Sequence, residues 1–231
     1  MHTQLDHLEG LDFRVEGGDR QILSGYLPQV SLAAQAAVYA GFQVSQATVI
    51  AREIHINLGQ VLRGKPLRLL QPFPVAGQIR LSQDDLHTSL RAPLLAQGLQ
   101  DVLQQLMQSQ PDTLPVGQKI PDLAAFCQSA EITALALGDG QLQLTWQAPD
   151  RQDQPGLSQS LILHTDLEIR DGRWLCLCRS AVKLSQAGTW SAPVALNEVV
   201  MDLGPEVNIQ RLTITASGIE VDGVVRVIPA A

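Results

Sequence analysis

The sequence predicts an α+β fold in which an antiparallel β-sheet is combined with one principal amphipathic helix. Most of the 231 residues alternate between apolar and polar with a period of two, Asp-Gly pairs separate some of these segments, and one long segment carries apolar residues at helical spacing. A sheet with one apolar face must cover that face. The residues alone leave two arrangements open: a sheet that rolls around the helix, or two sheets that stack.

Three segments show the alternation most clearly. Their apolar residues occupy every second position, as expected of strands with one buried and one solvated face. The residues expected on the buried faces are Val30, Leu32, Ala34, Ala36 and Val38, then Phe73, Val75, Ile79 and Leu81, and finally Ile219, Val221, Val225 and Val227. Polar side chains fill many of the positions between them, so we expect an antiparallel sheet.

The pair Asp171-Gly172 predicts a hairpin, because both residue types accept the positive φ angles of a type I′ turn. A two-residue loop at this point would fix the register of its two strands. The opposite pairs would be Ile169 and Trp174, Leu167 and Cys176, and Thr165 and Cys178. That register gathers the apolar residues and both cysteines on an inner face, and it places on the outer face His164, Asp166, Glu168, Arg170 and Arg179.

Two further features concern the strands. Asp139-Gly140 predicts a second turn, between strands over residues 132–137 and 142–146. Near the C-terminus the apolar phase slips between Ile209 and Leu212, which predicts a β-bulge near Gln210.

The principal helix is expected after Pro93. Ser82 with Asp85 forms a capping box that opens a preceding helix, and Pro93 breaks or restarts it. The apolar stripe that follows consists of Leu95, Leu99, Val102, Leu103 and Leu106. A shorter amphipathic helix is expected from Val194 to Met201, stopped by Gly204-Pro205. Loops are expected near residues 109–120 and 149–157, within a single domain that spans residues 1–231.

Composition excludes several classes of partner. The chain has 16 Lys and Arg against 23 Asp and Glu, a net charge of -7, and its only lysines are Lys65, Lys119 and Lys183. This balance gives no general attraction to nucleic acid, and no polybasic segment is present to hold the chain on an anionic leaflet. We expect at most weak binding to anionic vesicles, without insertion.

Cysteine usage and the N-terminus bear on location. Three cysteines cannot all pair, and Cys176 and Cys178 share one predicted strand, so a reducing compartment is expected. Residues 1–6 have neither a basic start nor an apolar core, so no signal peptide is expected, and no run of eighteen apolar residues is present. The predicted location is cytoplasmic, with transient contact at the periphery of a membrane left open.

Few residue patterns point to catalysis or metal binding. Ser180 and Lys183 match a Ser-x-x-Lys spacing, but on a strand these positions face opposite sides, so we interpret the match as chance. Glu53, His55 and Asn57 share a strand face, as do His164, Asp166 and Glu168, and both sets are interpreted as solvated faces. Cys176 and Cys178 are expected to pack as small apolar residues. No catalytic residue, metal ligand or cofactor is therefore predicted.

Three stretches carry a resemblance to a known family. The first is Gly25-Tyr26-Leu27-Pro28-Gln29-Val30, leading through Gly41 to Glu53-Ile54-His55-Ile56-Asn57; the second is residues 77–86 with Leu90 and Pro93; the third is residues 207–214 and 218–223. In this order they resemble the LmeA-like family of bacterial phospholipid-binding proteins, in a cyanobacterial-type form. The resemblance implies a tubular lipid-binding (TULIP-like) fold, a strongly curved antiparallel sheet wrapped around the helix.

The same resemblance implies a function. We expect non-enzymatic binding or carriage of a phospholipid or another acyl lipid in an apolar channel between the sheet and the helix. The residues expected to line it are Leu95, Leu99, Val102, Leu106, Leu167, Trp174 and Val221. As plain core residues, the helical ones would instead fill the space.

Two other functions remain open. A filled core would favour a structural or protein-interaction module, which the glutamine-rich helix face supports. An enzyme would use the face of His164, Asp166 and Glu168, and it would need a concave site with strongly perturbed carboxylates.

Overall fold

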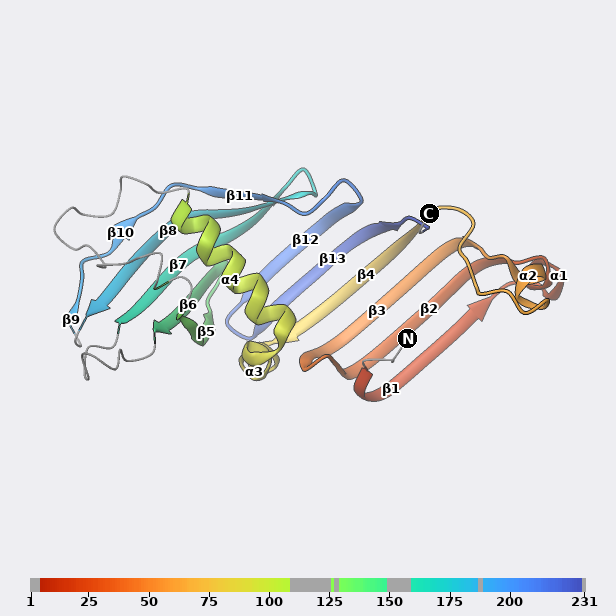
Figure 1. Ribbon diagram of the computed structural model, residues 1–231, viewed down its shortest axis with the longest axis horizontal. Coiled ribbons are helices and arrows are strands. Elements are labelled where there is room, and N and C mark those ends of the chain that lie inside the picture. The colour runs from red at the N-terminus through yellow and green to blue at the C-terminus, as the bar shows by residue number, and fades with distance from the viewer. Residues whose placement is uncertain (1–4, 109–125, 127–128, 149–158, 187–188, 230–231) are drawn as a thin grey trace.

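The computed structural model describes residues 5–108, 126, 129–148, 159–186 and 189–229. Long antiparallel strands and few helices confirm the predicted α+β class. Figure 1 shows the strands following one another along the long axis of the molecule, with the principal helix lying across one face. The loops expected near 109–120 and 149–157 fall outside the described residues, and the single-domain extent stays a prediction.

The first sheet has six antiparallel strands in the order β1-β2-β3-β4-β13-β12. Their bounds are β1 (Leu5–Glu16), β2 (Tyr26–Tyr39), β3 (Phe42–His55), β4 (Phe73–Ser82), β12 (Val207–Thr215) and β13 (Gly218–Val227). A register shift between Ile209 and Arg211 confirms the bulge expected near Gln210. Ala36 lies within β2, but its φ is 48° and it is exposed, unlike the buried Ala34.

The second sheet is built around a β7–β8 hairpin. Its order is β10-β8-β7-β6-β5, and β9 and β11 also pair with β8. The bounds are β5 (Glu131–Leu137), β6 (Gln141–Ala148), β7 (Gln159–Arg170), β8 (Trp174–Gln186), β9 (Thr189–Trp190), β10 (Val194–Ala195) and β11 (Val199–Asp202). The turn expected at Asp139-Gly140 connects β5 to β6, as predicted.

The two sheets lie in series and are not stacked (Figure 1). β12, the edge strand of the first sheet, meets the tips of two hairpins of the second. The Gly140 N–H donates to the Ile214 carbonyl at 3.0 Å, and the Ile209 N–H donates to the Gly172 carbonyl at 2.6 Å. This arrangement leaves most of the first sheet away from the helix that covers the second.

The predicted principal helix is α4 (Pro93–Gln108), preceded by α3 (Gln83–Thr88) and the 3-10 turn η1 (Ser89–Arg91). The capping box is confirmed: Ser82 Oγ accepts from the Asp85 N–H at 3.0 Å, and Asp85 Oδ2 accepts from the Ser82 N–H at 2.8 Å. Short helices α1 (Asp19–Leu23) and α2 (Leu58–Val61) lie at the far end of the first sheet.

The β7–β8 hairpin differs from the prediction by one residue. Arg170 pairs with Trp174, so the loop has three residues, and the opposite pairs are Leu167 with Leu177, Glu168 with Cys176, and Asp166 with Cys178. The extra residue is Arg173, whose side chain bonds Asp202 and lies over the Trp174 ring. Cys176 and Cys178 therefore lie on the face of Glu168 and Asp166 and not on the predicted inner face, although both are buried, as expected of small apolar residues.

Gly172 in this loop gives a test of the junction between the sheets. Its φ is +69°, and a Cβ there would overlap Asn208 Oδ1 of β12. Gly140 has a similar φ of +73° but open space around it. We expect Gly140→Ala to cost about 1 kcal/mol from backbone strain alone. Gly172→Ala should cost more, about 2 kcal/mol, because the Asn208 side chain must also rotate away from the added Cβ. Urea unfolding of both variants measures the difference, and equal costs would contradict this contact.

The helix predicted from Val194 to Met201 is also wrong. The segment instead forms β10 and β11, which pair with β8 at Val194–Val182 and Val200–Cys176. Its apolar spacing suits a helix, but a helix of eight residues is marginal alone. β8 offers unpaired backbone groups, and three valines in the segment favour strands.

Candidate functional site

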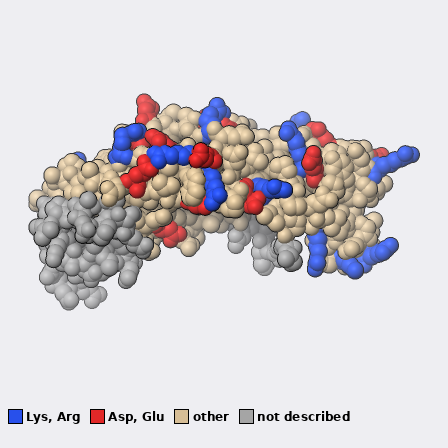
Figure 2. All heavy atoms as spheres, turned by 90° about the horizontal axis from the view of Figure 1, so that it is seen from above, with Lys and Arg blue, Asp and Glu red and all other residues tan. Residues whose placement is uncertain are grey.

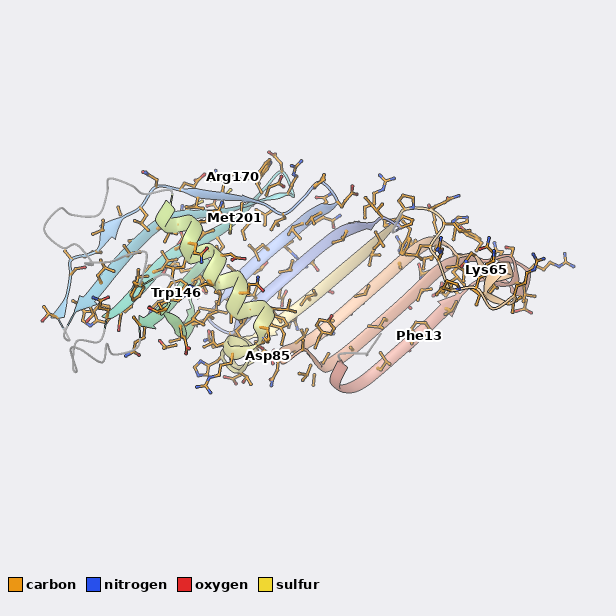
Figure 3. The ribbon with its side chains drawn as sticks, viewed as in Figure 1. Phe13, Lys65, Asp85, Trp146, Arg170 and Met201 are labelled. Atoms are coloured by element: carbon orange, nitrogen blue, oxygen red, sulfur yellow. The ribbon has the colours of Figure 1, made fainter. Side chains whose placement is uncertain are left out.

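The apolar stripe of α4 packs onto the second sheet. Leu99, Leu103 and Leu106 are buried, while Leu95 and Val102 are half-buried against the same cluster. Across from them, the cluster's fully buried members from the strands include Leu144, Trp146, Leu161 and Leu163 (Figure 3). The structure thus gathers four of the predicted channel residues, Leu95, Leu99, Val102 and Leu106, in one packed layer.

The other three predicted residues are divided. Leu167 of β7 packs against the cluster beneath α4. Trp174 at the start of β8 lies at the rim, where the Arg173 guanidinium is 4.8 Å from its ring centroid. Val221 lies in the middle of β13, half-buried, in the first sheet. The seven residues are thus divided among α4, the second sheet and the first sheet.

A larger apolar surface is created by the first sheet. Strand register aligns three rows of side chains on one face, and every position in them is apolar or glycine. The rows are Val15-Val30-Ala51-Val75-Val225-Val207, Phe13-Leu32-Val49-Gly77-Gly223-Ile209 and Ala34-Ala47-Ile79-Val221-Leu212. We call this surface the open apolar face.

The open apolar face is continuous with the core at one end and exposed at the other. Leu81 and Ile219, the next opposed pair after Ile79 and Val221, pack against the cluster beneath α4. Towards β1 the face is exposed, and the exposed fraction of Phe13 is 57% (Figure 3). Contiguous apolar surfaces that are exposed in this way usually mark binding sites.

The middle row of the open apolar face lacks side chains at its centre. Gly77 and Gly223 oppose each other on β4 and β13, so no side chain rises between Val49 and Ile209. A Cβ placed on Gly77 would have nothing within 4 Å. A shallow trough therefore lies over Gly77, and the Ile209 side chain borders it, because a Cβ on Gly223 would be 3.0 Å from Ile209 Cδ1.

The opposite face of the same sheet is mainly polar. Arg80 pairs with Glu220 across β4 and β13 at 2.5 Å, and Arg211 pairs with Asp222 at 2.5 Å. Gln78 lies between these pairs, exposed. One face can therefore take an apolar ligand while the other remains in water.

A separate depression of about 880 Å³ lies where α3 and α4 approach β5. Seven of the eleven described residues that line it are polar, among them His87, Arg91, Gln97 and Glu131. This lining suits water or a polar group better than an acyl chain.

The alternative enzyme site is an ion-pair network. Asp166 is buried and paired with Arg179, so the interpretation of its face as solvated is wrong for this residue. Arg170 bonds both carboxylate oxygens of Glu198. The hydrogen bond from Arg170 holds the pKa of Glu198 below its usual value. Burial, with a hydrogen bond to Glu198, raises the pKa of the Cys178 thiol to about 11. This thiol is protonated at neutral pH, so it is not an activated nucleophile.

The remaining sequence motifs have structural roles. Ser180 is buried in β8 and shares a hydrogen bond with Thr165 Oγ1 at 2.8 Å, as a strand residue and not a partner of Lys183. The interpretation of Glu53, His55 and Asn57 as a solvated face is wrong for Asn57. Its buried side chain accepts from the Arg68 N–H at 2.7 Å and donates to the Pro66 carbonyl at 3.0 Å. Within the described ranges, no three His, Cys, Asp or Glu side chains are grouped to hold a metal ion.

Comparison with known proteins supplies one finding. The sequence model of a family described as LmeA-like phospholipid-binding matches residues 1–224. The comparisons with curated proteins and with solved structures returned no match. The expected cyanobacterial type is not addressed by these findings and stays a prediction. Over the part of the chain that the structure describes, none of the helices has the length and apolar character to cross a bilayer.

Proposed function

Because this chain belongs to the LmeA-like phospholipid-binding family, we propose that it holds the acyl chains of a phospholipid against the open apolar face and carries the lipid without chemical change. The observation that supports this most strongly is the register of the first sheet. It places only apolar residues and glycine in three adjacent rows, and Phe13, Ile79 and Val225 among them are exposed.

The dimensions and energetics of this face suit an acyl chain. Six strands spaced about 4.8 Å apart give a sheet about 24 Å wide. An acyl chain occupies half of a hydrocarbon core, or about 15 Å. Burying it contributes roughly 0.8 kcal/mol per methylene, on the order of 10 kcal/mol for sixteen carbons before the costs of ordering.

The predicted channel residues take different parts in this proposal. Val221 contacts the lipid directly from the centre of the open apolar face. The packed end of the open apolar face, where the sheet meets α4, is formed by Leu95, Leu99, Val102, Leu106 and Leu167. Trp174 lies beyond this end, and we assign it no contact with lipid.

Native mass spectrometry of gently purified protein tests the proposal. We expect a phospholipid to remain bound, and we expect the delipidated protein to gain thermal stability when dioleoyl phosphatidylcholine is added in monomeric, cyclodextrin-delivered form. Absence of bound lipid together with an unchanged Tm would overturn the proposal. That outcome would favour the protein-interaction alternative.

A further inference from the structure

The end of the first sheet distant from α4 carries a built loop structure. α1 and the segment 58–71, which begins with α2, lie side by side there (Figure 1). The Ile56 N–H donates to the Gly25 carbonyl at 2.8 Å, and the Leu70 N–H donates to the His55 carbonyl at 2.8 Å. The Asn57 side chain holds the middle of the segment at Pro66 and Arg68. We call residues 19–23 and 58–71 the tip.

Four leucines of the tip are exposed, although hydrogen bonds hold its backbone in place. Leu23, Leu62, Leu67 and Leu70 have exposed fractions of 70%, 77%, 62% and 56%. A single exposed leucine is ordinary on a protein surface. Four occur here in two segments at the same end of the sheet, and clusters of exposed apolar residues mark contact surfaces for proteins or membranes.

The tip is also locally basic in a chain of net charge -7. Arg20, Arg63, Lys65 and Arg68 are all exposed, and no Asp or Glu occurs from residue 54 to residue 83. The tip itself contains one carboxylate, Asp19, against these four basic residues, and the nearest others in sequence are Glu16 and Glu53. Figure 2 shows Lys and Arg side chains projecting at this end, whereas charges of both signs are interleaved over the β7–β8 hairpin and β11.

We propose that the tip docks on the surface of a bilayer that contains anionic phospholipids. Leucines enter the boundary between headgroups and acyl chains, while the arginines and Lys65 bind headgroup phosphates. Basic residues interspersed with exposed leucines match this interface, because a bilayer presents negative charge above apolar chains. A soluble acidic partner would match the charge alone.

The position of the tip connects this docking to the lipid site. β1 ends and β4 begins beside it, so the row of Val15, Val30 and Val75 is the part of the open apolar face nearest to it. This part of the inference rests on the proposed function, because docking can transfer an acyl chain only if the open apolar face binds lipid. A docked tip would let an acyl chain pass between bilayer and sheet without crossing water.

Sedimentation of the full chain with vesicles tests the docking. The vesicles contain phosphatidylcholine alone or with 30% phosphatidylglycerol. We expect binding only to the anionic vesicles, weakening as salt is raised. The double variant Arg63→Gln/Lys65→Gln should bind them about 30-fold more weakly, since each basic residue near the surface contributes about 1 kcal/mol. The charge-matched control is Arg80→Gln/Arg211→Gln, which should bind as the wild type does.

The leucines are tested in the same assay. Leu62→Ser/Leu67→Ser should lose at least tenfold in binding, while the control Leu94→Ser/Leu203→Ser, at exposed leucines elsewhere, should not. Equal sedimentation of tip and control variants, or no wild-type preference for anionic vesicles, overturns the docking. Uptake of monomeric lipid from cyclodextrin is measured in parallel: uptake without vesicle binding rejects the tip alone, and vesicle binding without uptake rejects the proposed function alone.

Discussion

Replacing Ile79 with aspartate is expected to lower the affinity for phospholipid about 300-fold. Ile79 lies in the centre of the open apolar face, between Ala47 and Val221. A carboxylate there would face the acyl chain, and a charged group in a hydrocarbon environment costs about 2.5–3.5 kcal/mol. Equilibrium binding of a fluorescent phosphatidylcholine measures the change.

The matched control for this variant is Gln78→Asp. Gln78 is the preceding residue of the same strand, it is exposed, and its side chain lies on the polar face opposite Asp222. It introduces the same charge on the same strand of the sheet, but away from the proposed site, and should leave affinity within twofold of the wild type. Equal losses in both variants would mean that charge, and not its face, determines binding.

Replacing Gly77 with phenylalanine is expected to lower affinity about 200-fold without unfolding the protein. The ring would fill the trough over Gly77, displacing about four methylenes at roughly 0.8 kcal/mol each. Nothing lies within 4 Å of a Cβ at this position. Glycine destabilises the interior of a strand, whereas aromatic residues favour strands. The thermal stability of Gly77→Phe should therefore equal or exceed that of the wild type.

Ala76→Phe provides the control for Gly77→Phe. Ala76 is the neighbouring residue, and its register places it on the opposite face with Ile50 and Val224. The same ring is therefore added to the same strand on the other side of the sheet. Lipid binding by Gly77→Phe at the wild-type level, in a protein that remains folded, would show that the trough is not occupied by the acyl chain.

Much of the fold could be predicted from local patterns. Period-two alternation located β2, β4 and β13, and the Ser82–Asp85 capping box and Pro93 located α3 and α4. The errors arose where a long-range partner determines the outcome. Arg173 joins the hairpin loop because the distant Asp202 holds its side chain, and residues 194–201 become strands because β8 has a free edge. Neither partner is visible in the segment itself.

The site was harder to predict than the fold. Alternation shows that one face of β4 is apolar, but it does not show whether another element covers that face. From the sequence, the apolar stripe of α4 is the best candidate for the lining of a channel. In the structure the helix packs onto β5–β8 and leaves most of the first sheet uncovered. Of the predicted lining residues, only Val221 lies on the open apolar face. The tip could not be predicted because Arg20 and Lys65 are distant in sequence, and their segments come to the same end of the sheet only where the Ile56 N–H bonds the Gly25 carbonyl.

Photocrosslinking with a phosphatidylcholine that carries a diazirine in its acyl chain tests the central claim most directly. Labelled peptides identified by mass spectrometry should map to β1–β4 and β13, at residues such as Phe13, Val49, Ile79 and Val221. Excess unlabelled lipid should suppress this labelling. Crosslinks confined to α4 and the second sheet, or to the polar face around Gln78, would contradict the account.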